Sequence, residues 1–258
     1  MNGHQQLIAF KAIFWKEILR FGRIWIQTIL PPMITTALYF VIFGRLIGSQ
    51  IGDVHGYKYM EYIVPGLILM AVITNSYANV VASFYSAKFQ RSVEEMLVSP
   101  LPNYLIMAGF VGGGVARGLA VGFAVSIVAI LFTAIPVHNI WVVLSVLVLT
   151  SILFSLGGLI NAIYANSFDD ISIVPTFVLT PLTYLGGVFY TVAMLPPFWQ
   201  SVSLANPILY MVNAFRYGLL GVSDVNIGVA YAAIIGFTVA LGGYALVLLN
   251  RGDRKSVV

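Results

Sequence analysis

The side chains that could carry chemistry in this sequence are few and far apart. A P-loop would need Gly-Lys-Ser or Gly-Lys-Thr after a glycine-rich turn, and none of the five lysines follows a glycine. The histidines His4, His55 and His138 lie in separate segments, with no spacing typical of a metal site or a catalytic triad. We therefore expect no catalytic residues, no metal site and no ATP hydrolysis of this type in the chain.

Adjacent carboxylates occur twice, at Glu94-Glu95 and at Asp169-Asp170. Neighbouring residues on a helix do not face each other, so neither pair can form a two-carboxylate catalytic site in a helix. The chain has no cysteine, which excludes thiolate metal ligands and a cysteine nucleophile. These observations argue against an enzyme.

One charged residue, Arg117, lies inside a long apolar run. An arginine within a membrane is a functional candidate, for instance in a translocation path. The alternative is an arginine that faces a helix bundle and is satisfied by carbonyls or by Asn75, Asn79 or Asn161. No acidic residue lies deep in an apolar run, which argues against an ion-coupled carrier or channel, although that function remains the alternative.

The longest polar stretch between apolar runs is residues 87–100. On one continuous helix, Lys88, Arg91 and Glu95 would share a face, and Met96 and Leu97 would form an apolar tip. A short helix with these two features is suited to docking into a soluble partner. The alternative is a solvated loop. The candidate docking residues are Lys88, Arg91, Glu94, Glu95, Met96, Leu97 and Pro100.

The composition places these residues in a membrane protein. Of 258 residues, 60% are hydrophobic and 9% are charged, against about 25% charged in soluble domains. A soluble fold this apolar could not cover its surface, so we expect a single membrane domain over 1–258. The net charge of +4 does not indicate nucleic-acid binding here, because in a membrane protein the position of the cations matters.

Six apolar runs are long enough to span a bilayer, which needs about 20 residues. We therefore expect an all-α membrane protein with six transmembrane helices between residues 26 and 250. The expected spans are 26–48, 62–84, 104–134, 139–165, 171–192 and 226–249.

The lysines and arginines give the expected orientation. Nine lie on the side of the N-terminus, whereas the opposite side holds Arg45, Lys58 and Arg216. This asymmetry predicts that both termini are cytoplasmic and that residues 251–258 form a cytoplasmic tail.

The N-terminal segment 1–25 has a helical amphipathic pattern. Seven apolar residues share one broad face, and Lys16, Glu17, Arg20 and Arg23 lie opposite. This pattern predicts an interfacial helix with its cations toward anionic headgroups. Whether such a helix only anchors the chain or also contacts a cytoplasmic partner stays open.

Residues 193–225 do not fit a simple loop. Asn206 suits a helix N-cap, Pro207 the first helical position and Gly221 a helix stop. The apolar pieces on either side of Asn206-Pro207 are too short to span, so we expect a re-entrant pair of short helices before the last span. The aromatic residues expected near the outer headgroups are Phe198, Trp199, Tyr210, Phe215 and Tyr217.

Glycines recur every fourth residue in the third expected span, at Gly114, Gly118 and Gly122. They lie along one helix face and allow another backbone to approach closely. Packing within the chain is the expected use, and packing against a second copy is the alternative.

Taken together, these segments resemble the ABC-2-type permease family, the membrane subunits of many ATP-binding-cassette exporters. The resemblance covers nearly the whole chain. Its most specific stretches are Phe168-Asp169-Asp170 leading through Pro175 and Pro181 to Tyr184-Leu185-Gly186-Gly187-Val188-Phe189-Tyr190, then Leu195-Pro196-Pro197-Phe198-Trp199, Asn206-Pro207 and Phe215-Arg216-Tyr217-Gly218. The segment from Arg91 to Pro102 also looks like the first cytoplasmic loop of the family.

The resemblance implies a bacterial inner-membrane permease subunit that works as a homodimer with two copies of a separate ABC ATPase. It implies that the partner binds ATP and Mg²⁺, that this chain holds no cofactor, and that a coupling helix lies around residues 88–100. The exported cargo would be lipidic, a glycolipid or polysaccharide, or a hydrophobic drug. The candidate path and gate residues are Asn75, Asn79, Arg117, Tyr190, Phe198, Trp199, Tyr210 and Phe215.

Overall fold

The computed structural model describes residues 2–255, apart from the side chains of residues 45, 46, 49 and 253–255. The expected tail 251–258 therefore lies partly outside the described residues. Within them, the C-terminal helix continues to Lys255.

The described chain is a helical bundle with five helices long and apolar enough to cross a membrane. The first is Trp25–Gly44, which consists of α2 (Trp25–Tyr39) and the first part of the π-helix η1 (Phe40–Ile47). The other four are α4 (Tyr59–Phe89), α6 (Asn103–Phe132), α7 (Ile140–Tyr164) and α12 (Ile227–Lys255).

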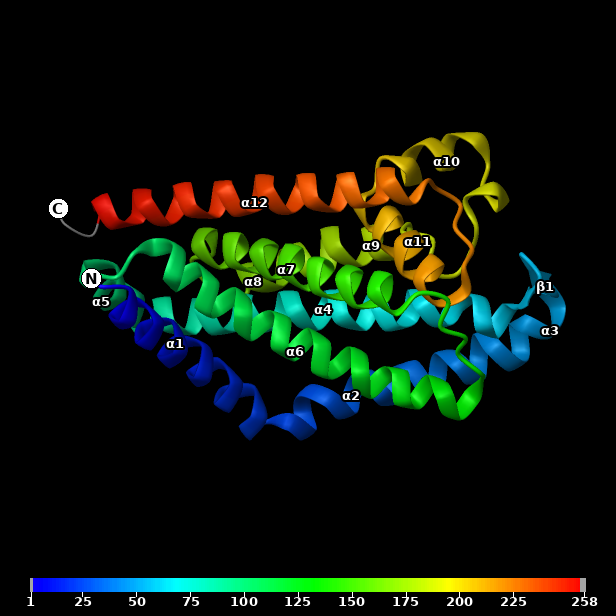
Figure 1. Ribbon diagram of the computed structural model, residues 1–258, viewed down its shortest axis with the longest axis horizontal. Coiled ribbons are helices and arrows are strands. Elements are labelled where there is room, and N and C mark those ends of the chain that lie inside the picture. The colour runs from blue at the N-terminus through cyan, green and yellow to red at the C-terminus, as the bar shows by residue number, and fades with distance from the viewer. Residues whose placement is uncertain (1, 256–258) are drawn as a thin grey trace.

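Figure 1 shows α4, α6, α7 and α12 side by side along the long axis of the molecule. One end of the bundle, here called the terminal end, holds the N-terminus, the C-terminal end of α12 and the short helix α5 (Ser92–Val98). The opposite end, here called the hairpin end, holds α3 (Gly48–Ile51) and the two-stranded hairpin of β1 (Asp53–Val54) and β2 (Tyr57–Lys58).

Helix α4 is the centre of the bundle and is buried along most of its length by α6 and α7. Two glycines of α6 make this packing close. A side chain at Gly114 would collide with Ser155 of α7 and Val80 of α4, and one at Gly118 would collide with Ser76 of α4. The glycine stripe therefore serves packing within the chain.

The segment expected as the fifth span, 171–192, is not one long helix. It consists of α8 (Asp170–Val174), the π-helix η2 (Pro175–Leu179) and α9 (Thr180–Tyr184). This run is about 22 Å long at 1.5 Å per residue, which is less than a bilayer core. Two prolines weaken its backbone hydrogen bonding, and Gly187, at φ 72°, turns the chain beyond its end.

The expected pair of short helices is present at the hairpin end, after the 3₁₀ turn η3 (Val192–Met194). Helix α10 (Pro197–Leu204) is largely exposed, whereas α11 (Pro207–Leu220) is buried in the bundle. The side chain of Asn206 accepts a hydrogen bond from the Ile208 N–H at 3.0 Å, and Gly221 ends α11 at φ 76°. The local cap signals were therefore correct.

The N-terminal helix α1 (Gly3–Arg23) packs against α6 and meets α2 at Ile24. Its apolar residues Leu7, Ile8, Trp15 and Leu19 are exposed. The opposite face does not lie wholly toward solvent, because Glu17 is fully buried in the bundle. This placement corrects the expectation that the charged face of α1 points only toward headgroups.

Candidate coupling surface and translocation groove

Helix α4 does not continue into α5, because the chain turns sharply at the terminal end of α4. Arg91 has φ 59°, in the left-handed region that no helix interior uses. Lys88 and Glu95 therefore lie on different helices, and the face they were expected to share with Arg91 does not exist. The spacing argument was wrong because it assumed one continuous helix.

Lys88 points into the bundle rather than toward solvent. Its Nζ donates to the carbonyls of Ile163 and Ala165, at 2.7 Å each, at the C-terminal end of α7. A cation in this position satisfies carbonyls that have no partner within their own helix and interacts favourably with the helix dipole. Lys88 thus fixes the terminal end of α4 to that of α7.

Helix α5 has an inner and an outer side. Val93 is buried, and Met96 and Leu97 are partly buried against the core, so this apolar side fastens α5 to the bundle. The expected apolar tip is therefore used inside the chain. Glu94 and Glu95 are exposed on the outer side, as are Arg91 and Pro100 at the two ends of the helix.

A charged cluster joins α1 to α4. The carboxylate of the buried Glu17 accepts from Arg20 at 3.1 Å and from Ser83 Oγ at 2.6 Å. Arg20 also donates to the backbone and side-chain oxygens of Asn79, at 3.1 and 2.8 Å. Asn79, expected in a translocation path, is instead fully buried between the helices.

Glycines of α6 make room for this cluster. A side chain at Gly109 would collide with Ile13, one at Gly113 with Glu17 itself, and one at Gly112 would crowd Phe14. The glycine-rich run of α6 thus receives α1 on one face, which lets a carboxylate reach Ser83 in the bundle.

Arg117 lies on the next turn of α6, one turn beyond Gly113. Its Nη2 donates to Asn75 Oδ1 at 3.1 Å, as the alternative of an arginine facing the bundle anticipated. Its Nε is buried and has no hydrogen-bond partner among the described residues. Arg20 bonds to Asn79, one turn along α4 from the Asn75 that Arg117 contacts.

A cavity of about 240 Å³ lies between α2 and α4 and is open on one side. We call it the α2–α4 groove. Its walls include Pro31, Pro32 and Thr35 of α2 and Met70, Thr74 and Asn75 of α4. Through Asn75, the guanidinium of Arg117 is one hydrogen bond away from this groove.

One wall residue of the groove, Tyr39, belongs to an aromatic cluster. The Tyr39 hydroxyl lies 3.2 Å from that of Tyr184 on α9, and its ring packs against Phe189 and Phe43. Phe189 also stacks on Tyr184. These rings link α2 to the broken helix α8–α9.

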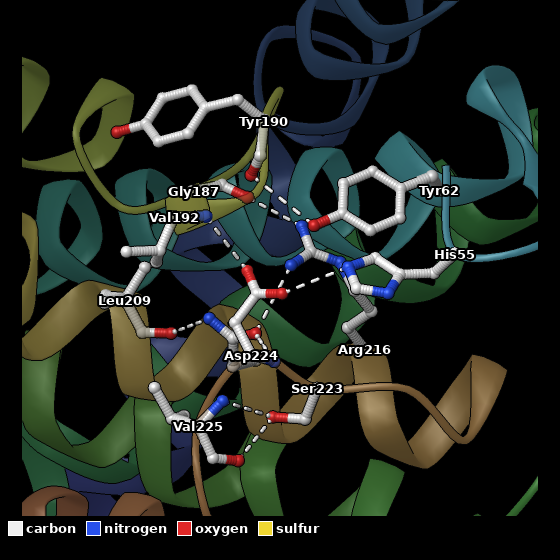
Figure 2. Close-up of polar contacts among 11 residues, drawn as sticks. His55, Tyr62, Gly187, Tyr190, Val192, Leu209, Arg216, Ser223, Asp224 and Val225 are labelled. Carbon is white, nitrogen blue, oxygen red and sulfur yellow. Dashed lines mark hydrogen bonds and ion pairs between the residues drawn. The ribbon is translucent and has the colours of Figure 1, made fainter. Parts of the chain in front are cut away.

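The hairpin end contains a second buried arginine, Arg216 of α11, which is 1% exposed. Figure 2 shows its guanidinium between Tyr62, Gly187 and Asp224. Nη2 donates to the Gly187 carbonyl at 2.6 Å, and the guanidinium carbon lies 4.0 Å from the centre of the Tyr62 ring. Arg216 therefore fixes the turn after α9 to α4 and α11.

Asp224 extends this hairpin-end cluster. Its carboxylate accepts from the Val192 N–H at 3.2 Å and lies 3.3 Å from His55 Nε2 of the hairpin, and its own N–H donates to Asn213 (Figure 2). Asn213 Oδ1 is also 3.4 Å from Arg216 Nη1. The hairpin, α4, the turn after α9, and α11 with the loop that follows it therefore meet around the buried Arg216.

The expected gate residues are not gathered in one place. Phe198 and Trp199 are exposed on α10, 70% and 45% respectively, whereas Phe215 is 1% exposed in the core. The expectation of Phe215 near headgroups was wrong, because α11 turns this side chain into the bundle. Tyr210 donates from its hydroxyl to the Leu204 carbonyl, and the Tyr190 backbone carbonyl accepts from Tyr62.

Comparison of the sequence with known proteins identifies the family of this chain. The family model described as ABC-2 type transporter matches residues 8–220, most of the chain. The chain belongs to the ABC-2 type transporter family. This family consists of membrane transport subunits that generally have no ATPase site of their own and that work with an ABC ATPase.

Relatives of this ABC-2 type transporter chain include a protein named inner membrane transport permease YadH, from Escherichia coli K12. The two are 57% identical over 250 residues, which cover 96% of this chain and 97% of the relative. Nodulation protein J of Rhizobium leguminosarum bv. viciae is 24% identical over 84% of each chain, and that of Rhizobium meliloti is 23% identical over 93% and 92%. The chain is accordingly a multi-pass inner-membrane protein.

Sequence reasoning about this ABC-2 type transporter chain missed two buried groups, Glu17 and Arg216. Glu17 was assigned to a solvated helix face, and Arg216 was counted among the outer cations. Signals for both were present. Gly112 and Gly113 have no side chains, which leaves room on their helix for a second helix to pack closely. Arg216 lies in an apolar helix bounded by its own cap residues, Asn206 and Gly221.

Proposed function

We propose that this chain is the permease subunit of an ABC exporter and that two copies of it pair with two copies of a separate ATPase. Family membership, which implies an ABC ATPase partner in general, supports the proposal. The ATPase would bind ATP and Mg²⁺. The cargo would leave the cytoplasm or the inner leaflet and would be lipidic, a glycolipid or polysaccharide, or a hydrophobic drug.

The proposed topology has six crossings, with the terminal end in the cytoplasm. The sixth crossing would be the broken helix α8–α9 with the turn after it. Two contacts support this proposal, because Phe168 packs against Tyr85 near one end of α4, and the Phe189 carbonyl accepts from Tyr59 at the other. The burial of Arg216 also removes it from the count of cations on the opposite side, which strengthens the positive-inside asymmetry.

Helix α5 is the proposed coupling element. The observation that carries this assignment is the exposed pair Glu94 and Glu95 on a short helix whose other side is held by Val93, Met96 and Leu97. A partner that pushes on this outer side would move α5 together with the bundle. Lys88 would pass the movement to α7 through its two carbonyl contacts.

The α2–α4 groove is the proposed cargo path, with Asn75 in its wall and the Tyr39–Tyr184 contact as its constriction toward the hairpin end. Tyr190, Phe198, Trp199 and Tyr210 do not line this groove, and they are proposed as gate residues farther along the path. Asn79 and Phe215 are left out of the path, because their side chains are buried in helix contacts.

The first test is a mild-detergent pull-down of the tagged chain from its own membranes, followed by mass spectrometry. We expect a near-stoichiometric soluble protein that carries a P-loop. Elution of the chain alone, together with transport by the pure chain under an ion gradient, would favour the ion-coupled carrier instead.

The second test reverses both charges on α5. In the complex, Glu94→Lys with Glu95→Lys should lower ATP-driven transport at least about tenfold while basal ATP hydrolysis continues, because removal of a charge-paired contact is worth more than 1.4 kcal/mol. Asp53→Lys, at an exposed acid on β1 at the opposite end of the bundle, is the matched control and should transport normally. Normal transport by the α5 double variant would contradict the coupling assignment.

A further inference from the structure

The charges where α1, α4 and α6 meet do not balance. Among the described residues, two partly buried guanidinium groups, Arg20 and Arg117, lie at this junction with one buried carboxylate, Glu17. Glu17 accepts from Arg20 through one oxygen and from Ser83 through the other, and neither oxygen accepts from Arg117 among the described contacts. Arg117 is therefore left with the amide of Asn75 as its described polar partner.

An uncompensated cation inside a bundle is costly, so a chain retains one where it has a use. The hairpin end shows how this chain holds an arginine that serves structure. Arg216 has a carbonyl, an amide oxygen, an aromatic face and a nearby carboxylate around it. Arg117 lacks a comparable set among the described residues, although the Nε of each arginine is buried without a hydrogen-bond partner.

The geometry beside Arg117 is suited to an anion. The guanidinium is a planar fork of five N–H donors that pairs with two oxygens of a phosphate or carboxylate. Its bond to Asn75 ends at a residue that lines the α2–α4 groove, so a small rotation of Asn75 would present the guanidinium to a group in the groove. Arg20 adds a second positive charge nearby.

The groove itself is suited to an amphiphile. Leu67, Met70 and Ala71 give it an apolar wall on α4, and Pro31 and Pro32 give one on α2. Hydroxyls of Thr35 and Thr74 add polar groups to the same walls. A molecule with an apolar chain and an anionic headgroup would match both the walls and the charge.

We propose that the α2–α4 groove binds an anionic amphiphile, with its phosphate or carboxylate headgroup turned to Arg117, and that this molecule is the transported cargo. The binding part stands on the groove and on Arg117 alone. The cargo part rests on the function proposed above and deepens it, because it excludes neutral lipids and cationic drugs as preferred cargo.

The binding test uses the purified chain in detergent without any ATPase. Short-chain phosphatidic acid and phosphatidylcholine with identical acyl chains are titrated in, and native mass spectrometry counts the bound lipid. We expect the wild type to favour phosphatidic acid at least about tenfold. Arg117→Gln should abolish this preference, Arg117→Lys should keep part of it, and Lys58→Gln, at an exposed cation on β2, should leave it unchanged.

A second variant guards against misfolding of Arg117→Gln. Thr74→Leu fills the groove and leaves Arg117 in place, so it should lower the binding of both lipids at least about tenfold. An undiminished preference for phosphatidic acid in Arg117→Gln, or normal binding by Thr74→Leu, would overturn the proposed site.

The cargo test uses the complex with its ATPase in proteoliposomes that carry fluorescent phosphatidic acid or phosphatidylcholine. ATP-driven transfer of the anionic lipid, absent with Arg117→Gln, is the expected result. Binding without ATP-driven transfer, while another compound is exported, would overturn the cargo assignment and leave the exporter function standing. Absence of any ATP-driven transport would instead contradict the exporter function, which the binding test does not use.

Discussion

Arg216 and Arg117 both lie on helices of the same bundle, Arg216 buried and Arg117 partly buried, and the chain surrounds them differently. Around Arg216 the carbonyl of Gly187, the face of Tyr62 and the amide of Asn213 take up the charge from three directions. Around Arg117 the described contact is a single amide, that of Asn75, and the nearby charge of Arg20 repels it.

Arg216 is therefore a cation that holds the fold together, whereas Arg117 is a cation that the fold leaves accessible. A buried charge with several partners stabilises the segments that supply them, because loss of the charge leaves every partner unsatisfied. A partly buried charge with one described partner does not stabilise several segments in this way and carries a desolvation cost, so its presence points to binding. The fold of the hairpin end should therefore depend on Arg216, and ligand preference on Arg117.

The largest effect is expected when the two arginines are changed in the same way. Arg216→Gln should lower the free energy of unfolding by about 3–5 kcal/mol, because it leaves the Gly187 carbonyl and the Asp224 carboxylate inside the protein without the cation. Arg117→Gln should change it by less than about 1 kcal/mol in either direction. Thermal unfolding of both variants in the same detergent measures the contrast.

Equal destabilisation by the two substitutions would break the comparison. It would mean that Arg117 is as much a structural residue as Arg216, and the case for a ligand beside it would lose its basis.

A smaller effect is expected from Glu17→Gln, which removes the one described carboxylate near Arg117. This variant should lose about 1–3 kcal/mol of stability, because Arg20 and Ser83 lose a charged partner. Adding Arg117→Gln should restore part of the loss, since the second cation near Arg20 disappears. A double-mutant cycle measured by thermal unfolding tests this, and strictly additive effects would show that the two sites do not interact.

The smallest effect is expected at an exposed charge, Asp170 at the start of α8. Hydrogen bonds from the Asn166 N–H and from Ser167 hold the pKa of this carboxyl below its ordinary value. Its stabilising contribution is therefore complete above the ordinary carboxyl pKa and disappears as the pH falls through the folded-state pKa. Asp170→Asn should melt slightly below the wild type at pH 7, and the two curves should converge in acid.

A melting difference for Asp170→Asn that stays constant from pH 7 to pH 3 would show that the charge is not what matters there. A melting difference as large as that of Arg216→Gln would show that burial does not determine how much each charge contributes to stability. It would contradict the contrast between Arg216 and Arg117.

The local features of the fold could be read from the sequence, because they depend on neighbouring residues. Apolar length gave five of the helices that could span a membrane, and Asn206 and Gly221 gave the bounds of α11. The expected fifth span is not one continuous helix, also for a local reason, since Pro175, Pro181 and Gly187 shorten and turn this apolar segment.

The roles of the charged residues were decided by the tertiary structure. The sequence determined that Lys88, Glu17 and Arg216 are charged and lie on helices, but not which groups they meet. Each of them has a hydrogen-bond partner 29 to 77 residues away along the chain, across helix contacts that no local pattern encodes. Lipid and protein interior are both apolar, so hydrophobicity alone cannot tell which face of a helix meets the bundle. The small residues of α6 and the turn at Arg91 determine which helix faces meet the bundle. They thereby determine which charges are buried and which remain exposed for a partner.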